Sequence, residues 1–268
     1  MKTNYFTLIT GASQGFGKAM AIECAKRDMN LVLVSLPNTG LNELADVLEN
    51  IYKVSVFSIE LDLSTSENCV SLFELVKKEK ISIRYFINNA GVLSKGLFKD
   101  LDTKYILCQI SLNVCTPTLL IKLFLNDLKE NAPSGILNVG SMASFFYLPK
   151  KQVYGGTKAY LLSFSRSLRR ELQRDNISVS IVCPGGMNTT AALTYQNRTG
   201  SWGSRMSIMD PEDAAILAID GMLRGKEVIV PGILNRFFMF LNSILPKPVK
   251  DKITAVEINK FKTEMLCS

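Results

Sequence analysis

The stretch that decides the fold is Thr10–Met20, TGASQGFGKAM, which overlaps and extends the apolar run YFTLIT at 5–10. Gly11, Gly15 and Gly17 stand between this run and an amphipathic segment. Glycine permits a tight turn and a close backbone approach, and the N-terminus of a following helix attracts phosphate. The stretch therefore predicts a strand, a loop and a helix that together bind the pyrophosphate of a dinucleotide.

The same alternation continues along the chain. Short apolar runs, typical of strands buried on both faces, are separated by longer segments that fit helices. The runs lie at 5–10, 31–35, 54–59, 85–89, 135–140, 178–183 and 227–230, and the helical segments at 14–28, 41–51, 65–79, 101–130, 152–175 and 211–224. Because helices between strands imply crossovers, the pattern predicts an α/β fold: a Rossmann-like, doubly wound, parallel seven-stranded sheet with helices on both faces. We expect a single domain over 1–268, with 231–268 as a C-terminal extension packed on it.

Composition narrows the function classes. The 268 residues are 47% hydrophobic, and the formal net charge of +7 comes from scattered basic residues, so we expect no nucleic-acid binding. The chain has no histidine, which excludes Ser-His-Asp catalysis and histidine-based metal sites, and we expect no metal. The six cysteines form no C-x-x-C pair, so we expect buried, reduced thiols in a cytoplasmic protein. The N-terminus lacks a signal-peptide pattern, and we expect no membrane span.

The glycine spacing, G-x-x-x-G-x-G, resembles that of the short-chain dehydrogenase/reductase family. The resemblance runs from about Thr7 to Pro231. It rests on motifs in order: Thr10–Gly17, LDLS at 61–64, NNAG at 88–91, LNV at 112–114, VGS at 139–141, Tyr154–Lys158 and CPGGMNT at 183–189. It implies the strand order 3-2-1-4-5-6-7, an NAD(P) cofactor, and hydride transfer that interconverts a carbonyl and a secondary alcohol on a small molecule. It also implies a homodimer or homotetramer formed through the helices at 101–130 and 152–175.

Tyr-x-x-x-Lys occurs twice, at Tyr147–Lys151 and at Tyr154–Lys158. Residues four apart share one face of a helix, so either pair could form one site. Pro149 disfavours helical geometry just before it, so the first pair is not expected to share a helix. The segment after Tyr154 fits a long helix, and we assign the chemistry to the second pair.

The assignment has a chemical reason. A carbonyl oxygen that gains negative charge during hydride transfer needs a proton, and a phenol beside an ammonium can supply it. We expect Lys158, together with the positive charge of an oxidised nicotinamide, to lower the pKa of Tyr154. The Ser141 hydroxyl is expected to hold and polarise the substrate oxygen.

The resemblance adds further roles. It implies a catalytic set of Asn113, Ser141, Tyr154 and Lys158, in which Asn113 anchors a water of a proton relay. It implies that Asp62 binds the adenine amino group. The cofactor-binding residues that it implies are Gly11, Ser13, Gln14, Gly15, Phe16, Gly17, Ser35, Asp62, Leu63, Asn89, Ala90, Gly91, Tyr154, Lys158, Pro184, Gly185, Met187 and Thr189.

The end of the second predicted strand bears on the choice between NADP and NAD. The sequence at 31–40, LVLVSLPNTG, offers neither the acid that binds both ribose hydroxyls of NAD nor an arginine for a 2′-phosphate. Ser35, Asn38 and Thr39 can donate hydrogen bonds to a phosphate, and Lys18 adds positive potential. We expect NADP(H) rather than NAD(H).

Alternatives stay open for the pocket, the tail and the function. We expect residues 190–210 to be a substrate lid, or else a surface loop. The tail at 231–268 is expected to pack on the domain, where it could fold against the pocket mouth, or on a partner subunit, and a membrane surface is the less favoured alternative. A non-catalytic dinucleotide-sensing or scaffold protein is the rival function. The expected substrate pocket consists of Ser141, Phe146, Tyr147, Met187 and Trp202.

Overall fold

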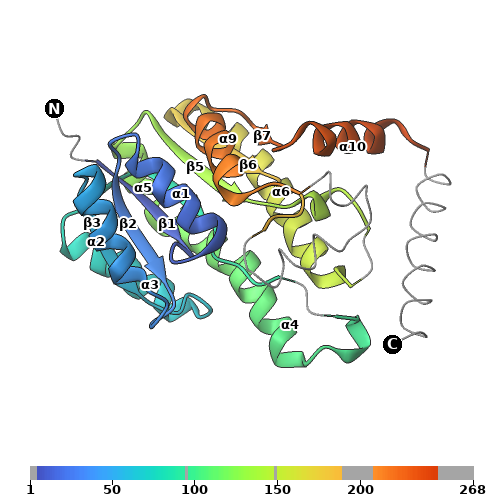
Figure 1. Cartoon of the computed structure of the whole chain (residues 1–268), viewed down its shortest axis with the longest axis horizontal. Helices are drawn as coiled ribbons and strands as arrows, with labels where there is room; N and C mark the ends of the chain where they lie inside the picture. The colour runs from blue at the N-terminus through green and yellow to red at the C-terminus, as the bar shows by residue number, and fades with distance from the viewer. Residues whose placement is uncertain (1–4, 94–95, 148–149, 189–207, 247–268) are drawn as a thin grey trace.

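Seven parallel strands form one sheet in the order β3-β2-β1-β4-β5-β6-β7, as predicted (Figure 1). The computed structural model describes residues 5–93, 96–147, 150–188 and 208–246. The strands are β1 (Tyr5–Thr10), β2 (Asn30–Ser35), β3 (Val56–Glu60), β4 (Ser82–Asn88), β5 (Ser134–Val139), β6 (Ile177–Val182) and β7 (Val228–Ile229).

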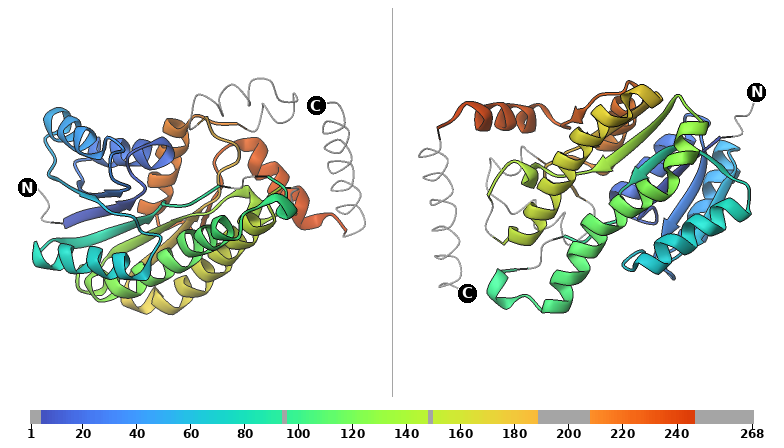
Figure 2. Two further views of the ribbon diagram at one scale, coloured as in Figure 1. Left: turned by 90° about the horizontal axis from the view of Figure 1, so that it is seen from below. Right: turned by 180° about the vertical axis from the view of Figure 1, so that it is seen from behind.

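Helices cover both faces of this sheet (Figure 2). On one face lie α1, α2 and α9, and on the other lie α3, α5 and α6. The helices are α1 (Gly15–Ala25), α2 (Leu41–Tyr52), α3 (Ser66–Lys78), α4 (Thr103–Ile110), α5 (Thr116–Glu130), α6 (Gln152–Leu172), α9 (Pro211–Leu223) and α10 (Ile233–Ile244). Shorter turns are η1 (Phe98–Asp100), η2 (Ser111–Cys115), η3 (Met142–Ser144) and η4 (Gln173–Asp175).

Each face of the sheet has its own large hydrophobic cluster, and a third, smaller cluster includes Leu161 and Ile181. Successive side chains of a strand point to opposite faces, so Leu8 and Ile9, neighbours on β1, belong to different clusters. Both are fully buried. This two-sided burial is why the strands appear in the sequence as continuous apolar runs.

The segment expected as one helix at 101–130 differs from the prediction. It is divided by η2, a π-helical turn at Ser111–Cys115. Hydrogen bonds to other segments accompany the wider turn: Thr116 donates to the Leu63 carbonyl at 2.6 Å, and Asn113 bonds to the main chain of Val92. A π turn accommodates an extra residue in a helix, and here it carries Asn113.

The same segment bears on the expectation of no membrane span, which stays a prediction. By length and composition alone, Thr103–Glu130 is apolar enough to cross a membrane. In the fold, α5 buries Leu120 and Phe124 against the sheet, and a core helix has the same composition. Packing on the sheet therefore accounts for part of its apolar character.

The topology opens a crevice at the carboxyl ends of β1 and β4. The chain leaves β1 through α1 toward β2, but leaves β4 through α4 and α5 toward β5 on the other side. Ligands of open α/β sheets bind at such a switch point. The C-terminal extension begins with α10, which Figure 1 shows beyond the β7 edge of the sheet.

The glycine loop between β1 and α1 has little spare room. Gly11 and Gly15 have positive φ angles of +66° and +54°, which side chains rarely adopt. A Cβ atom on Gly17 would lie 2.0 Å from the Gly11 carbonyl oxygen, which is a backbone atom. The loop can therefore close onto the start of α1 only with glycine at this position.

Two alanine substitutions test this constraint. We expect Gly17→Ala to lower the free energy of unfolding by about 1–3 kcal/mol, as overpacking does, and to abolish dinucleotide binding. Gly156→Ala is the matched control, since a Cβ on this exposed helical glycine meets nothing within 4 Å. It should raise stability by about 0.5–1 kcal/mol. Urea unfolding measures both, and equal stabilities of the two variants would contradict the constraint.

Candidate active site

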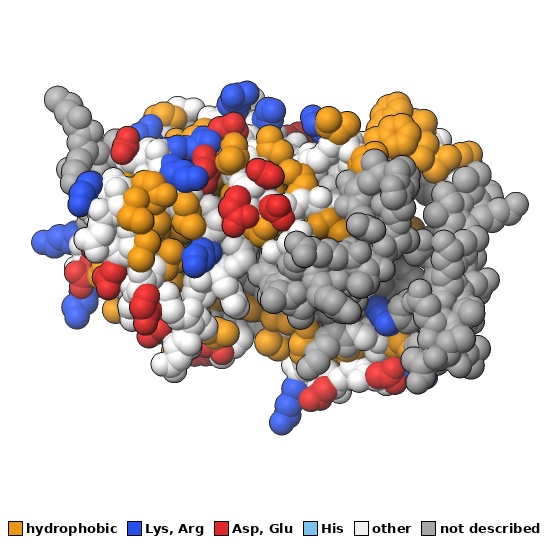
Figure 3. Space-filling model, viewed as in Figure 1, with side chains coloured by type: hydrophobic (Ala, Val, Ile, Leu, Met, Phe, Trp, Pro, Cys, Tyr) orange, Lys and Arg blue, Asp and Glu red, His pale blue; other side chains and the backbone are white. Residues whose placement is uncertain are grey.

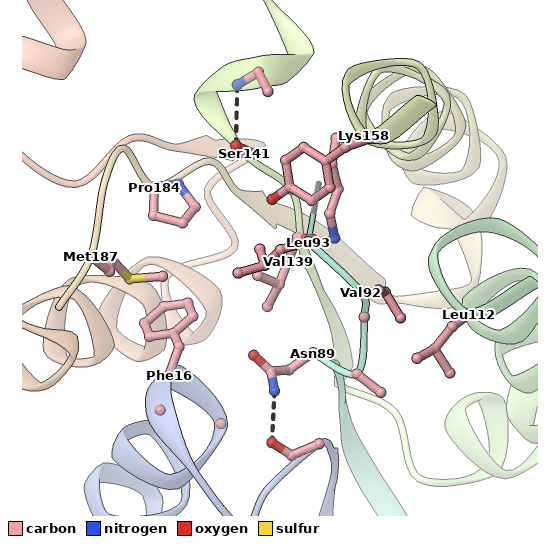
Figure 4. A pocket seen from close by; sticks show the side chains of 18 of the residues that line it. Phe16, Asn89, Val92, Leu93, Leu112, Val139, Ser141, Lys158, Pro184 and Met187 are labelled. Atoms are coloured by element: carbon pink, nitrogen blue, oxygen red, sulfur yellow. Dashed lines mark hydrogen bonds between the residues drawn. The ribbon is translucent and has the colours of Figure 1, made fainter. Parts of the chain in front are cut away.

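A cleft of about 1280 Å³ lies at the carboxyl ends of the strands. Its lining comes from the glycine loop, the ends of β2, β4 and β5, the start of α6 and the turn after β6. Figure 4 shows Phe16, Asn89, Ser141, Lys158 and Met187 around this space. Segments that are far apart in the sequence therefore meet at one site.

The cleft collects nearly all residues expected to bind the cofactor. Thr189 lies outside the described residues. The others line the cleft: Gly11, Ser13, Gln14, Gly15, Phe16, Gly17, Ser35, Asp62, Leu63, Asn89, Ala90, Gly91, Tyr154, Lys158, Pro184, Gly185 and Met187. Their placement around one space is what a shared ligand requires, while their individual roles stay predictions.

The expected substrate pocket is only partly assembled. Ser141, Phe146 and Met187 line the cleft. Tyr147 does not: its side chain is 86% exposed, so the expectation that it lines the pocket is corrected. Tyr147 also precedes α6, which begins at Gln152, so the pair Tyr147–Lys151 shares no helical face, as predicted. Trp202 and most of the expected lid lie outside the described residues.

Side-chain hydrogen bonds hold the glycine loop against the end of β4. The Asn89 amide donates to the carbonyls of Thr10 and Gly11 at 3.0 and 2.9 Å. The Thr10 hydroxyl accepts from the main-chain N–H groups of Asn89 and Ala90, both at 3.0 Å. Asn89, expected among the cofactor-binding residues, lines the cleft, and its amide also joins the two strand ends.

The far end of the cleft contains the residues that would surround an adenosine. Asp62 lines it and accepts a hydrogen bond from the Ser64 N–H at 2.9 Å. The hydroxyls of Ser35 and Thr39 lie 2.8 Å apart and also line it. Glu60, the nearest acid on β3, accepts from the Asn38 N–H instead. Lys18 is exposed on α1 and is not among the lining residues.

Tyr154 and Lys158 project from one face of α6 and are 8% and 5% exposed. The Lys158 ammonium lies 5.8 Å from the centre of the Tyr154 ring and donates to the Val139 carbonyl at 2.8 Å. Burial lowers the pKa of Lys158 to about 8, since the charged form loses its hydration. A buried amine held by a carbonyl is thus fixed beside the phenol.

Within the protein's own residues, the pKa of the Tyr154 phenol shifts in the direction opposite to the expected one. Burial raises the pKa of Tyr154, and a hydrogen bond with Ser141 acts in the opposite direction more weakly. The phenol therefore stays protonated at neutral pH.

The other two members of the predicted set lie on either side of this pair. Ser141 begins η3, where its hydroxyl accepts from the Ala143 N–H at 3.1 Å. Asn113 is buried next to Gly91. A Cβ on Gly91 would lie 2.8 Å from the Asn113 side-chain oxygen and 3.6 Å from the Lys158 nitrogen, so both side chains pack against this glycine. The Asn113 side chain bonds to Val92, so its place in a proton relay stays a prediction.

Cysteine burial was predicted for the whole set and is found for part of it. Cys24, Cys69 and Cys183 are buried, whereas Cys108 is partly exposed and Cys115 is exposed. Burial raises the pKa of Cys183 to about 12, so its thiol stays protonated. In the described part of the chain, no cluster of three or more His, Cys, Asp or Glu side chains is placed to hold a metal ion.

Sequence reasoning allowed the C-terminal extension to fold against the pocket mouth, but it did not identify which of its residues reach the cleft. Asn235 and Phe238 of α10 line the cleft, and Asn242 donates to the Phe145 carbonyl at 2.9 Å. A Cβ on Gly185 would lie 2.7 Å from the Asn235 side chain, so the two segments are closely packed. The Pro231-Gly232 turn before α10 is a signal for a change of direction, but it does not indicate where the helix goes.

The lowered pKa of Lys158 gives a pH-dependent prediction for stability. Between about pH 8 and pH 10.5 the unfolded chain binds more protons at this residue than the folded chain does. The group therefore favours folding more as the pH rises through this window. We expect the free energy of unfolding of the natural protein to increase relative to that of Lys158→Met between about pH 7 and pH 10. Urea unfolding at both pH values measures the difference between the two free energies of unfolding. A difference that does not change with pH would refute a lowered pKa of the buried Lys158 amine.

Comparisons with known proteins agree with this geometry. Residues 6–199 match the family profile of short chain dehydrogenases. An NADP-dependent 3-hydroxy acid dehydrogenase from Schizosaccharomyces pombe is 31% identical over 234 residues, which cover 85% of this chain and 90% of that protein. A bulky-bulky ketone specific alcohol dehydrogenase from Comamonas testosteroni is 28% identical with a TM-score of 0.74, covering 91% of this chain and 96% of that one. A short-chain dehydrogenase from Sphingobium yanoikuyae in complex with NADPH is 27% identical with a TM-score of 0.76, covering 91% and 97%. The chain belongs to the short-chain dehydrogenase family and is an NAD(P)-dependent oxidoreductase that acts on alcohol or ketone groups.

Proposed function

We propose that this protein interconverts a ketone and a secondary alcohol, with Tyr154 as the general acid and base. The observation that carries the proposal is the buried pair on α6, in which the Lys158 amine is fixed beside the Tyr154 phenol in a glycine-lined cleft. Burial of the Lys158 ammonium costs free energy of folding. Buried ionisable groups with shifted pKa values cluster at functional sites, so this cost points to a role in proton transfer.

The residues of the cleft fit a dinucleotide. A Cβ on Gly11 would lie 2.9 Å from the Ala90 Cα and from the Asn89 amide, so glycine keeps the loop open to a close ligand. The loop ends at the N-terminus of α1, where main-chain N–H groups favour a pyrophosphate. A bound nicotinamide supplies or accepts the hydride.

The chain's own residues handle the oxygen. Because burial raises its pKa, the Tyr154 phenol carries a proton at neutral pH, the state in which it can donate to a carbonyl oxygen that gains charge. Ser141 places a second hydroxyl at the same point of the cleft. In the reverse direction the phenolate must form, and a positive charge nearby favours it. Lys158 and an oxidised nicotinamide are the groups that supply this charge.

The rival function is a non-catalytic dinucleotide-sensing or scaffold protein on the same fold, because a fold alone does not determine activity. Such a protein would bind NADPH but leave carbonyl compounds unchanged.

Variants of Tyr154 separate these two functions. We expect the natural protein to oxidise NADPH in the presence of a carbonyl compound, and Tyr154→Phe to lower kcat by about 10²–10⁴-fold, the usual contribution of a general acid. A panel of ketones, followed by NADPH absorbance, measures this. Tyr160→Phe is the matched control, since Tyr160 is 40% exposed on the same helix and does not line the cleft. Equal turnover by the Tyr154 variant would refute the role of the phenol.

The proposed cofactor is NADP(H) rather than NAD(H). The hydroxyls of Ser35 and Thr39 stand at the end of β2, where no described acid lines the cleft beside Leu36. Glu60 is held by the Asn38 N–H and is not part of the lining. The relative from Schizosaccharomyces pombe is NADP-dependent, and the structure from Sphingobium yanoikuyae contains NADPH.

An acid at the end of β2 should reverse this preference. Leu36 is 52% exposed and lines the cleft. We expect Leu36→Asp to raise the KM for NADPH about 10- to 100-fold through repulsion of a 2′-phosphate, and to lower the KM for NADH. Leu36→Asn introduces a side chain of nearly the same shape as aspartate but without the charge. It should leave the ratio of the KM for NADPH to the KM for NADH close to that of the natural protein. A natural protein that prefers NADH would overturn the assignment.

Two further expectations stay predictions. The outward faces of α4 and α6 expose Leu107, Ile110 and Tyr160, which suits the expected homodimer or homotetramer, and light scattering would measure its mass. The cytoplasmic location rests on the sequence alone.

A further inference from the structure

Two lysines stand in the cleft close to the reacting residues, and the reaction proposed above has no use for them. Lys150 and Lys151 lie on the segment between η3 and α6, and both line the cleft. Lys150 is half-buried, and Lys151, the last residue before the first turn of α6, is exposed at the rim of the cleft. They are separate from Lys158, which lies two turns into the helix.

The lysines lie on the substrate side of the cleft. The glycine loop, Asp62 and Ser35 mark the end that suits a dinucleotide, and they come from β1, β2 and the segment after β3. Lys151 instead precedes Tyr154 by three residues, about one turn of helix or 5 Å along its axis. Lys151 and Tyr154 therefore reach the same cleft from neighbouring positions at the start of α6.

Charge in this part of the cleft has one sign. Among the described residues that line the cleft, Asp62 alone is acidic, and it lies at the dinucleotide end. Desolvation lowers the pKa of Lys151, although part of its side chain reaches solvent, and no carboxylate acts in the opposite direction. An anion placed here would restore the stability of the charged form.

The neighbouring walls are apolar and close together. Phe146, Met187 and Phe238 also line the cleft and come from three different segments. Apolar walls with a few charged groups are typical of sites that orient a small ligand. This combination suits a short carbon chain that carries an anionic group near its carbonyl.

We infer that the substrate is a short oxo acid or hydroxy acid whose carboxylate pairs with Lys151, assisted by Lys150. The inference rests on the proposed carbonyl chemistry and names the substrate class for it. The short spacing from Tyr154 favours a carboxylate on the substrate itself over the distant phosphates of a large acyl carrier.

The test compares an acid with its uncharged ester. The substrates are 3-oxobutanoate, its methyl ester and its coenzyme A thioester, each reduced with NADPH by the full-length protein. We expect the natural protein to prefer the acid. Lys151→Gln should lower the ratio of kcat/KM for the acid to that for the ester about 10- to 100-fold, the usual effect of losing a charge-assisted hydrogen bond. The effect should appear in KM, and Lys150→Gln should add to it.

Three controls make the result specific. Lys151→Arg keeps the charge and should retain the preference for the acid. Lys78→Gln removes an exposed lysine on α3 that does not line the cleft, and should leave the ratio unchanged. Titration of 3-hydroxybutanoate into protein saturated with NADP⁺, followed by calorimetry, should show weaker binding to Lys151→Gln without any turnover.

The outcomes distinguish failure of the carboxylate site from failure of the proposed carbonyl reduction. A natural protein that prefers the ester or the thioester, or a Lys151→Gln variant with an unchanged ratio, overturns the carboxylate site. If those results come with ketone reduction that depends on Tyr154, the proposed reaction stands. If no carbonyl compound is reduced at all, the proposed reaction fails and the inference fails with it.

Discussion

The cleft depends on the hydrogen bonds between Thr10 and Asn89. They join the ends of β1 and β4 at the point where the chain leaves the sheet in opposite directions. Each side chain bonds to main-chain groups of the other strand, so the two loops cannot separate without losing several bonds in a partly buried place. The glycine loop is thereby held in position, and every lining residue of the cleft is placed relative to it.

Burial controls the chemistry of the two residues on α6. Removing water from the Lys158 ammonium lowers its pKa, and removing water from the Tyr154 phenol raises the pKa of that group. Both shifts favour the neutral forms. The phenol is therefore neutral at neutral pH, whereas the Lys158 amine, with a pKa of about 8, still carries its proton there. A nearby positive charge changes this balance, because it stabilises the phenolate. The Val139 carbonyl holds the amine in either state, since both forms of lysine can donate a hydrogen bond.

Much of the fold could be predicted because its strands are buried on both faces. The run at 5–10 coincides with β1, and the glycine triplet lies where the loop was expected. Periodicity cannot distinguish a continuous helix from one with a π turn, so the turn around Asn113 was missed. The exposure of Tyr147 was also missed, because three successive aromatic residues at 145–147 give no indication of which one points away from the cleft. The direction of the Tyr154 shift depends on how deeply the fold buries it, which a motif does not specify.

The space-filling view shows orange apolar surface over α10, where Ile233, Phe237 and Phe240 are exposed (Figure 3). The same helix sends Asn235 and Phe238 into the cleft, although it lies outside residues 6–199, which match the family profile. The residues of the family profile and the part of the cleft lining that α10 supplies are thus encoded by separate stretches of the gene. Mutations in the later stretch can change which molecules enter without disturbing the proton donor, so this architecture allows selectivity to diverge among descendants while the reaction is inherited intact.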